Sequence, residues 1–106
     1  MIVSGHPGAS LAGLRVMERG GNVVDATIAT SAALTVMLGH ATSIGGDGFL
    51  LFHNAAENRT LALNGSGVAP LAATPERFSA GIPLLGPTAA LVPGLMRVPT
   101  SIRETP

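Results

Sequence analysis

The sequence predicts an α/β fold in which two helices precede a pair of strands. Apolar residues recur at helical spacing within residues 9–19, and a nearly uncharged helical pattern follows over residues 24–37. Two short apolar runs, residues 49–53 and 60–63, flank a polar turn, which is typical of a hairpin. A glycine-rich segment, residues 45–48, joins the two halves.

The composition predicts that part of the apolar surface meets another chain or a further segment. Hydrophobic residues make up 46% of the 106 residues, with no Trp, no Tyr and three Phe. Charged residues make up only 11%, against about 25% in an ordinary domain. This leaves too little polar surface to cover a small globule. The chain is therefore expected to be a piece of something larger.

Charge and cysteine content exclude several functions. Six Arg and no Lys balance six acidic residues, so there is no basic face for nucleic acid. The absence of cysteine excludes a disulfide framework and a zinc–cysteine site. The longest apolar run, residues 23–38, is too short and too polar for a membrane span. No signal peptide is visible in residues 1–4, and the chain as given favours a cytoplasmic location.

The first helix is expected within residues 9–19. Residues 2–3 are short and apolar and are expected to end a strand. Residues 4–7 form a turn that opens the helix, because Pro7 suits a first helical turn. The pair Gly20-Gly21 ends it.

The second helix is expected to begin after a capping residue, Asn22. Asp25 stands three residues later and completes a capping-box pattern, with its carboxylate at the positive helix end. Nearly every side chain in residues 24–37 is small or apolar, which predicts a helix buried on all sides.

The glycine segment, residues 45–48, allows another backbone to approach closely. It becomes a site only if another part of the chain converges on it. The strand at residues 49–53 lacks polar alternation until its end, so we expect both of its faces to be covered. A polar turn leads to the second strand at residues 60–63, and a flexible elbow, residues 64–67, follows.

The remainder of the chain is expected to be largely irregular. Residues 74–78 have the pattern of one capped helical turn. From residue 81 onward, prolines interrupt an apolar stretch that has too few polar residues for a disordered tail. It resembles a connection that stops before the structure it should join.

No motif for a nucleotide, a metal or another cofactor is recognisable. The glycine segment lacks the lysine of a phosphate loop and precedes a strand, whereas a dinucleotide fingerprint precedes a helix. The separations of His6, His40 and His53 match no metal-ligand spacing. No serine lies in a nucleophile elbow, although a Ser/His/Asp set stays open because geometry defines it. Residues 64–67 either present amides and a hydroxyl to an anion or form an ordinary turn.

Several segments, taken in order, carry a family resemblance. They are Val3–Pro7 with Ser10 and Gly13, Gly20–Ala26, Ile44–Phe49, Asn64–Gly65 and Ala69–Pro70, with Val92–Gly94 as a weaker later match. Together they resemble the N-terminal part of the gamma-glutamyltransferase family, which comprises glutathione hydrolases and related acylases. The resemblance covers residues 1–78.

This resemblance implies the four-layer αββα sandwich of N-terminal nucleophile hydrolases, of which this chain would be only the beginning. Residues 1–106 would form one partial domain, with residues 79–106 as an irregular, truncated connection. Family members are precursors that cleave themselves into a large and a small subunit. The new N-terminal Thr of the small subunit acts as nucleophile and, through its α-amino group, as base.

By resemblance, the partners of this chain are the rest of the large subunit, the small subunit and a small amide such as glutathione. No cofactor or metal is implied. The Thr nucleophile is absent from the 106 residues, so no catalytic residue is assigned and the isolated chain is expected to be inactive.

The elbow departs from the family pattern at one position. Family members that bind glutamate carry Asp-Gly-Arg-Glu after the second strand, and the Arg side chain binds the α-carboxylate of the substrate. Here the matching residues are Asn64-Gly65-Ser66-Gly67, so Ser66 replaces the Arg. Asn64 and Ser66 are therefore the candidate substrate-binding residues. The alternatives are an acylase-like relative acting on a non-glutamyl amide, and an inert truncated product that acts only as an interaction module.

Overall fold

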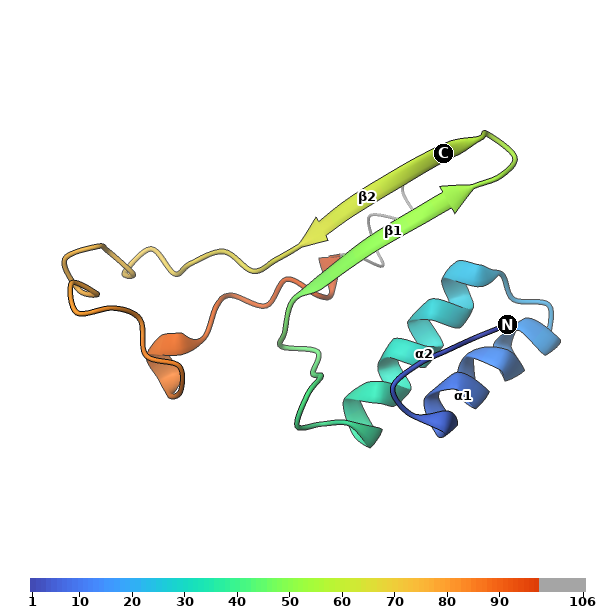
Figure 1. The fold of residues 1–106 in the computed structure, drawn as a ribbon, viewed down its shortest axis with the longest axis horizontal. Coiled ribbons are helices and arrows are strands. Elements are labelled where there is room, and N and C mark those ends of the chain that lie inside the picture. The colour runs from blue at the N-terminus through green and yellow to red at the C-terminus, as the bar shows by residue number, and fades with distance from the viewer. Residues whose placement is uncertain (98–106) are drawn as a thin grey trace. The chain divides into compact units, whose positions relative to one another are not determined.

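The computed structural model describes residues 1–97, in which two helices precede a two-stranded antiparallel sheet (Figure 1). These residues divide into two compact units, residues 1–44 and residues 45–97, and each unit is described by itself. The part of the expected connection that falls on residues 98–106 lies outside the described residues. The elements are α1 (Pro7–Glu18), α2 (Val23–Met37), β1 (Gly48–Asn54), β2 (Arg59–Gly65) and a short 3₁₀ helix, η1 (Pro87–Ala89).

Helix α1 covers Pro7–Glu18, close to the predicted residues 9–19, and the sequence did not predict its cap. His6 is the N-cap, and its Nδ1 accepts a hydrogen bond from the Gly8 amide over 3.1 Å. Pro7 occupies the first helical turn, where its missing N–H costs nothing. At the other end Gly20 has a φ of +89°, the left-handed conformation that favours glycine after a helix.

Helix α2 confirms the predicted capping box. The Asn22 side chain accepts hydrogen bonds from the amides of Val24 at 2.8 Å and Asp25 at 3.0 Å. The Asp25 carboxylate in turn accepts from the Asn22 amide at 3.2 Å. These bonds satisfy amides that have no partner inside the helix.

Small residues hold the two helices together. Ala9 and Gly13 of α1 are buried, as are Ala26 and Thr30 of α2. The Thr30 hydroxyl donates to the Ala26 carbonyl over 2.8 Å, which satisfies this polar group inside the contact. A Cβ on Gly13 would collide with Thr30 Oγ1 and lie 3.0 Å from the Ala26 carbonyl oxygen. The absence of a side chain at residue 13 therefore sets how closely the helices approach.

Two expectations for this unit are wrong. Helix α2 is not buried on all sides, since Val36 is 84% exposed. Within its unit α2 packs against α1, and one neighbouring helix covers only one stripe of a helical surface. Ile2 and Val3 form no strand, because a strand needs the ladder hydrogen bonds of a partner.

The hairpin of β1 and β2 has the predicted strands, each extended by one or two residues at its ends. Phe49 pairs with Asn64, and Leu51 pairs with Ala62. The expectation that both faces of β1 are covered is wrong, because Phe49 is 74% and Leu51 is 75% exposed. Successive side chains of a strand point to opposite faces, so these two residues share the uncovered one.

Between β2 and residue 97, the chain contains the expected helical turn and one further element, η1. The amides of Arg77 and Phe78 donate to the carbonyls three residues earlier, at 3.1 and 3.2 Å. Hydrogen bonds from its own backbone amide and then from the Thr74 hydroxyl lower the pKa of the exposed Glu76 carboxyl.

The close approach of the two helices predicts the effect of adding one methyl group. Gly13→Ala should destabilise the chain by about 1–3 kcal/mol, because the new Cβ overpacks the contact with Thr30. Urea unfolding of the complete protein that contains these residues, followed by circular dichroism, measures this change. Thr30→Ala in the same chain removes the colliding oxygen and should recover part of the loss, which a double-mutant cycle quantifies.

Ser31→Ala, at an exposed position of α2, is the matched control and should have little effect. A Gly13→Ala chain as stable as the original would contradict the packing described above.

Candidate functional site

Three segments that are distant in sequence meet in the second unit. They are the glycine segment (residues 45–48), the elbow (residues 64–67) and a stretch that we term the return segment (residues 91–95). The amides of Gly94 and Leu95 donate to the Gly46 carbonyl at 3.3 and 2.9 Å. Other parts of the chain therefore converge on the glycine segment, which is what a site at this segment requires.

The elbow is attached to both of its neighbours. The Gly67 amide donates to Asp47 Oδ1 of the glycine segment over 2.6 Å. Immediately after the elbow, the Val68 carbonyl accepts from the amide of Val92 in the return segment over 3.0 Å. The elbow is thus fixed on two sides by hydrogen bonds from residues distant in sequence.

Glycines make this convergence possible. A Cβ on Gly67 would collide with the Val92 carbonyl oxygen, and a Cβ on Gly94 would collide with the Gly65 carbonyl oxygen. A Cβ on Gly48 would collide with the Leu95 side chain. At Gly67 and Gly94 the backbones therefore touch directly, and any larger residue there would force them apart.

The structure places Asn64 and Ser66, the two predicted substrate-binding residues, side by side on the elbow. Asn64 is exposed at the end of β2, and its Oδ1 accepts from the Ser66 amide over 2.9 Å. Asn64 therefore shapes the turn through its side-chain oxygen. Ser66 is half-buried, and its hydroxyl makes no hydrogen bond within the part of the chain that the structure describes.

The interpretation of the elbow as an anion-binding nest is disfavoured. The Ser66 amide is engaged by Asn64 and the Gly67 amide by Asp47, so neither is open to an incoming anion. A carboxylate, itself negatively charged, already occupies the place that an anion would take.

Sequence reasoning missed Asp47 as a site residue. Its position among three glycines was the available signal, because a charged side chain in such a segment has no evident role in backbone packing. Its partner Gly67 lies 20 residues further along the chain, and no spacing rule connects the two.

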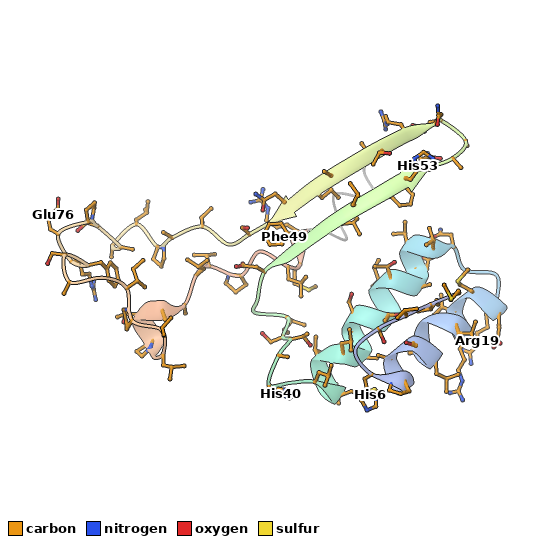
Figure 2. The ribbon with its side chains drawn as sticks, viewed as in Figure 1. His6, Arg19, His40, Phe49, His53 and Glu76 are labelled. Atoms are coloured by element: carbon orange, nitrogen blue, oxygen red, sulfur yellow. The ribbon has the colours of Figure 1, made fainter. Side chains whose placement is uncertain are left out.

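Two of the three histidines, His6 and His53, serve local structure. His6 caps α1, and His53, at the far end of β1 from Phe49, hydrogen-bonds through Nδ1 to Thr60 Oγ1 over 3.0 Å (Figure 2). Within residues 1–97, no group of three or more His, Asp or Glu side chains is placed to hold a metal ion. Neither helix in these residues has the length and apolarity needed to cross a bilayer.

The first unit contains an apolar cavity of about 430 Å³. It is lined by the N-terminal segment, including Ile2, and by α2 residues such as Thr30 and Leu34. The Thr30 hydroxyl is already bonded to a backbone carbonyl, and no titratable side chain lines the cavity. The elbow is therefore the better candidate site.

The docking of the return segment predicts a local effect of Gly94→Ala. The new Cβ would lie 2.6 Å from both the Gly67 nitrogen and the Ser66 carbonyl carbon, so the return segment must move away from the elbow. The Val92 amide should then exchange with solvent at least about tenfold faster, because its bond to Val68 opens more often. Hydrogen-exchange mass spectrometry or NMR of the complete protein measures this rate.

Ser79→Ala, an exposed change outside the three segments, serves as the control. Unchanged protection of Val92 in the Gly94→Ala chain would show that the segments do not depend on direct backbone contact.

Comparison with known proteins identifies the family. The model of the gamma-glutamyltranspeptidase family matches residues 9–102, which extends past residue 78 and includes the return segment. The chain is 39% identical over 99 residues to a "Glutathione hydrolase-like YwrD proenzyme" of Bacillus subtilis (strain 168), with 91% of this chain and 19% of the relative covered. It is 38% identical over 93 residues to an "Oxamate amidohydrolase proenzyme" of Klebsiella pneumoniae, with 86% of this chain and 17% of the relative covered.

The crystal structure of Helicobacter pylori gamma-glutamyltranspeptidase superimposes with a TM-score of 0.86 at 36% identity, covering 94% of this chain and 30% of that chain. The chain thus spans about a fifth of the curated relatives it matches. Its helices and strands are part of an N-terminal nucleophile hydrolase fold, which confirms the predicted fold class. The chain belongs to the gamma-glutamyltranspeptidase family and corresponds to the N-terminal part of the large subunit.

Proposed function

We propose that this chain is the beginning of the large subunit of an amide hydrolase or acyl transferase, and that its elbow contacts the acyl group of the substrate. The observation that carries the proposal is the Ser66 hydroxyl. Ser66 is half-buried, its hydroxyl makes no hydrogen bond within residues 1–97, and two other segments hold the elbow in place.

In this proposal the chemistry is completed by residues outside the chain. A Thr at the start of the small subunit would attack the amide carbonyl with its hydroxyl, while its α-amino group takes the proton. The C–N bond breaks, the amine leaves with a proton, and an acyl ester remains on the Thr. Water or an amine then takes the acyl group. The 106 residues would contribute binding and orientation, and the isolated chain would have no turnover.

Two classes of acyl group are consistent with the family. The relatives described above include a glutathione hydrolase-like proenzyme and an oxamate amidohydrolase proenzyme at nearly equal identity, 39% and 38%. A γ-glutamyl group is the first class, since gamma-glutamyltranspeptidase names the family. Ser66 favours the second class, a non-glutamyl amide, because a hydroxyl offers one hydrogen bond and no positive charge for an α-carboxylate.

A third candidate is an inert product of a shortened gene that acts only as an interaction module. The exposed apolar face with Phe49 and Leu51 is the observation that favours binding to another polypeptide. As a self-contained module, the 106-residue chain should unfold in one sharp transition. As part of a larger enzyme, it should aggregate or lack fixed tertiary packing when isolated.

Sequencing the encoding locus downstream of codon 106 tests the proposal. We expect the reading frame to continue to a Thr-rich processing segment, and the purified product to separate into two polypeptides, the smaller beginning with Thr. N-terminal sequencing and mass spectrometry check this result. A stop codon directly after Pro106, with no gene for a partner subunit beside it, would exclude catalysis and leave the interaction module.

Exchange of Ser66 tests the placement of the elbow in the complete, processed enzyme. Ser66→Arg should raise kcat/KM for a γ-glutamyl anilide by about tenfold or more, because a guanidinium pairs with the α-carboxylate in a charge-assisted bond. Ser66→Ala should lower kcat/KM for the preferred amide by about three- to tenfold, the value of one neutral hydrogen bond.

Ser79→Ala is the matched control, since this exposed serine lies outside the elbow and should leave both rates unchanged. If neither substitution of Ser66 alters either rate, the elbow does not contact the acyl group.

A further inference from the structure

We propose that Asp47 positions the elbow and that its charge selects for acyl groups that carry no carboxylate beside Ser66. The inference deepens the proposed function and rests on the contact between elbow and acyl group. The sequence pattern alone assigns Asp47 no role beyond its place in the glycine segment.

The contact that positions the elbow is a short, charge-assisted hydrogen bond. The Gly67 amide lies 2.6 Å from Asp47 Oδ1, at the short end of the range for an N–H donor and a carboxylate. The bond joins residues 20 apart in sequence, so it fixes the elbow to a different segment. The Asn64 side chain holds the preceding amide, that of Ser66.

These two bonds determine the conformation on either side of Ser66. With the amides of residues 66 and 67 both engaged by side chains, the backbone that carries the Ser66 hydroxyl has little freedom to rotate. Asp47 is exposed, so water can solvate the Gly67 amide when the carboxylate is removed. The loss of Asp47 should therefore disturb the orientation of the elbow more than the stability of the fold.

Within the described residues, no cation forms an ion pair with the Asp47 carboxylate. The ion pair that the structure shows within residues 1–97 joins Arg59 to Glu57 at the hairpin turn, with 3.3 Å between nitrogen and oxygen. Asp47 takes part in no such pair among these residues. Its negative charge is thus bonded to the amide that directly follows Ser66.

A substrate carboxylate placed against the Ser66 hydroxyl would lie one residue from the amide to which the Asp47 carboxylate is bonded. Like charges held on one turn repel even at a partly hydrated surface, and a neutral group of the same shape is not penalised. The elbow should therefore accept a carboxamide, a hydroxyl or an ammonium in preference to a carboxylate.

Two isosteric substrates separate the charge effect from shape. In the complete, processed enzyme, kcat/KM is measured for 4-carboxybutyryl p-nitroanilide, which is anionic, and for 4-carbamoylbutyryl p-nitroanilide, which is neutral. The original enzyme should prefer the neutral substrate. Asp47→Asn keeps an acceptor for the Gly67 amide and removes the charge, so the preference should fall by about three- to tenfold. Added salt should reduce the preference of the original enzyme and leave that of Asp47→Asn unchanged.

Asp47→Ala tests positioning separately from charge. It removes the acceptor as well, so KM for the neutral substrate should rise several-fold while kcat changes little, and Asp47→Asn should restore KM. In protein labelled with ¹⁵N-glycine, the Gly67 amide proton should exchange faster in Asp47→Ala than in Asp47→Asn. Glu57→Gln removes an equal charge at the hairpin turn and is the control that should leave the preference unchanged.

The outcomes separate this inference from the proposed function. If neither anilide nor any other amide is turned over, the proposed function fails and the inference fails with it. If both anilides are turned over and Asp47→Asn has the same preference as Glu57→Gln, the inference is overturned while the proposed function stands. Equal exchange of the Gly67 amide in Asp47→Ala and Asp47→Asn would likewise show that Asp47 does not position the elbow.

Discussion

Direct backbone contact among the glycine segment, the elbow and the return segment is the constraint on which the second unit depends. At Gly67 and Gly94 a single Cβ would occupy space already filled by a backbone atom of another segment. The hydrogen bonds of Gly67 to Asp47 and of Val92 to Val68 form only because these segments of the chain approach so closely. The elbow is therefore presented as a fixed turn, which a residue that orients a substrate requires.

What could be predicted from the sequence was local. The capping box of Asn22 and Asp25 lies within one helical turn, so the order of residues was enough to identify it. The strands followed from two apolar runs around a polar turn. The bond between Asp47 and Gly67 spans 20 residues. A glycine indicates that another segment can approach closely, but it does not indicate which segment that is. The family resemblance located the elbow, and the structure added the carboxylate that holds it.

Burial was the least predictable property, for a physical reason. Apolar side chains such as Val36, Phe49 and Leu51 suit a covered surface, yet each is largely exposed among the described residues. A sequence pattern indicates whether a side chain prefers to be buried. It does not indicate which part of the protein covers that side chain. In the proposed enzyme, these faces would meet other parts of the assembly. The small residues at the contact of α1 and α2, by contrast, are buried within their own unit.

A crystal structure of the complete, processed enzyme with a bound, slowly reacting acyl analogue tests the central claim most directly. The account predicts that the acyl group lies within about 3.2 Å of Ser66 Oγ, a hydrogen-bonding distance, while the Gly67 amide still donates to Asp47. An acyl group that touches no atom of the elbow would contradict the account. A Gly67 amide turned from Asp47 toward the ligand would contradict the role assigned to Asp47.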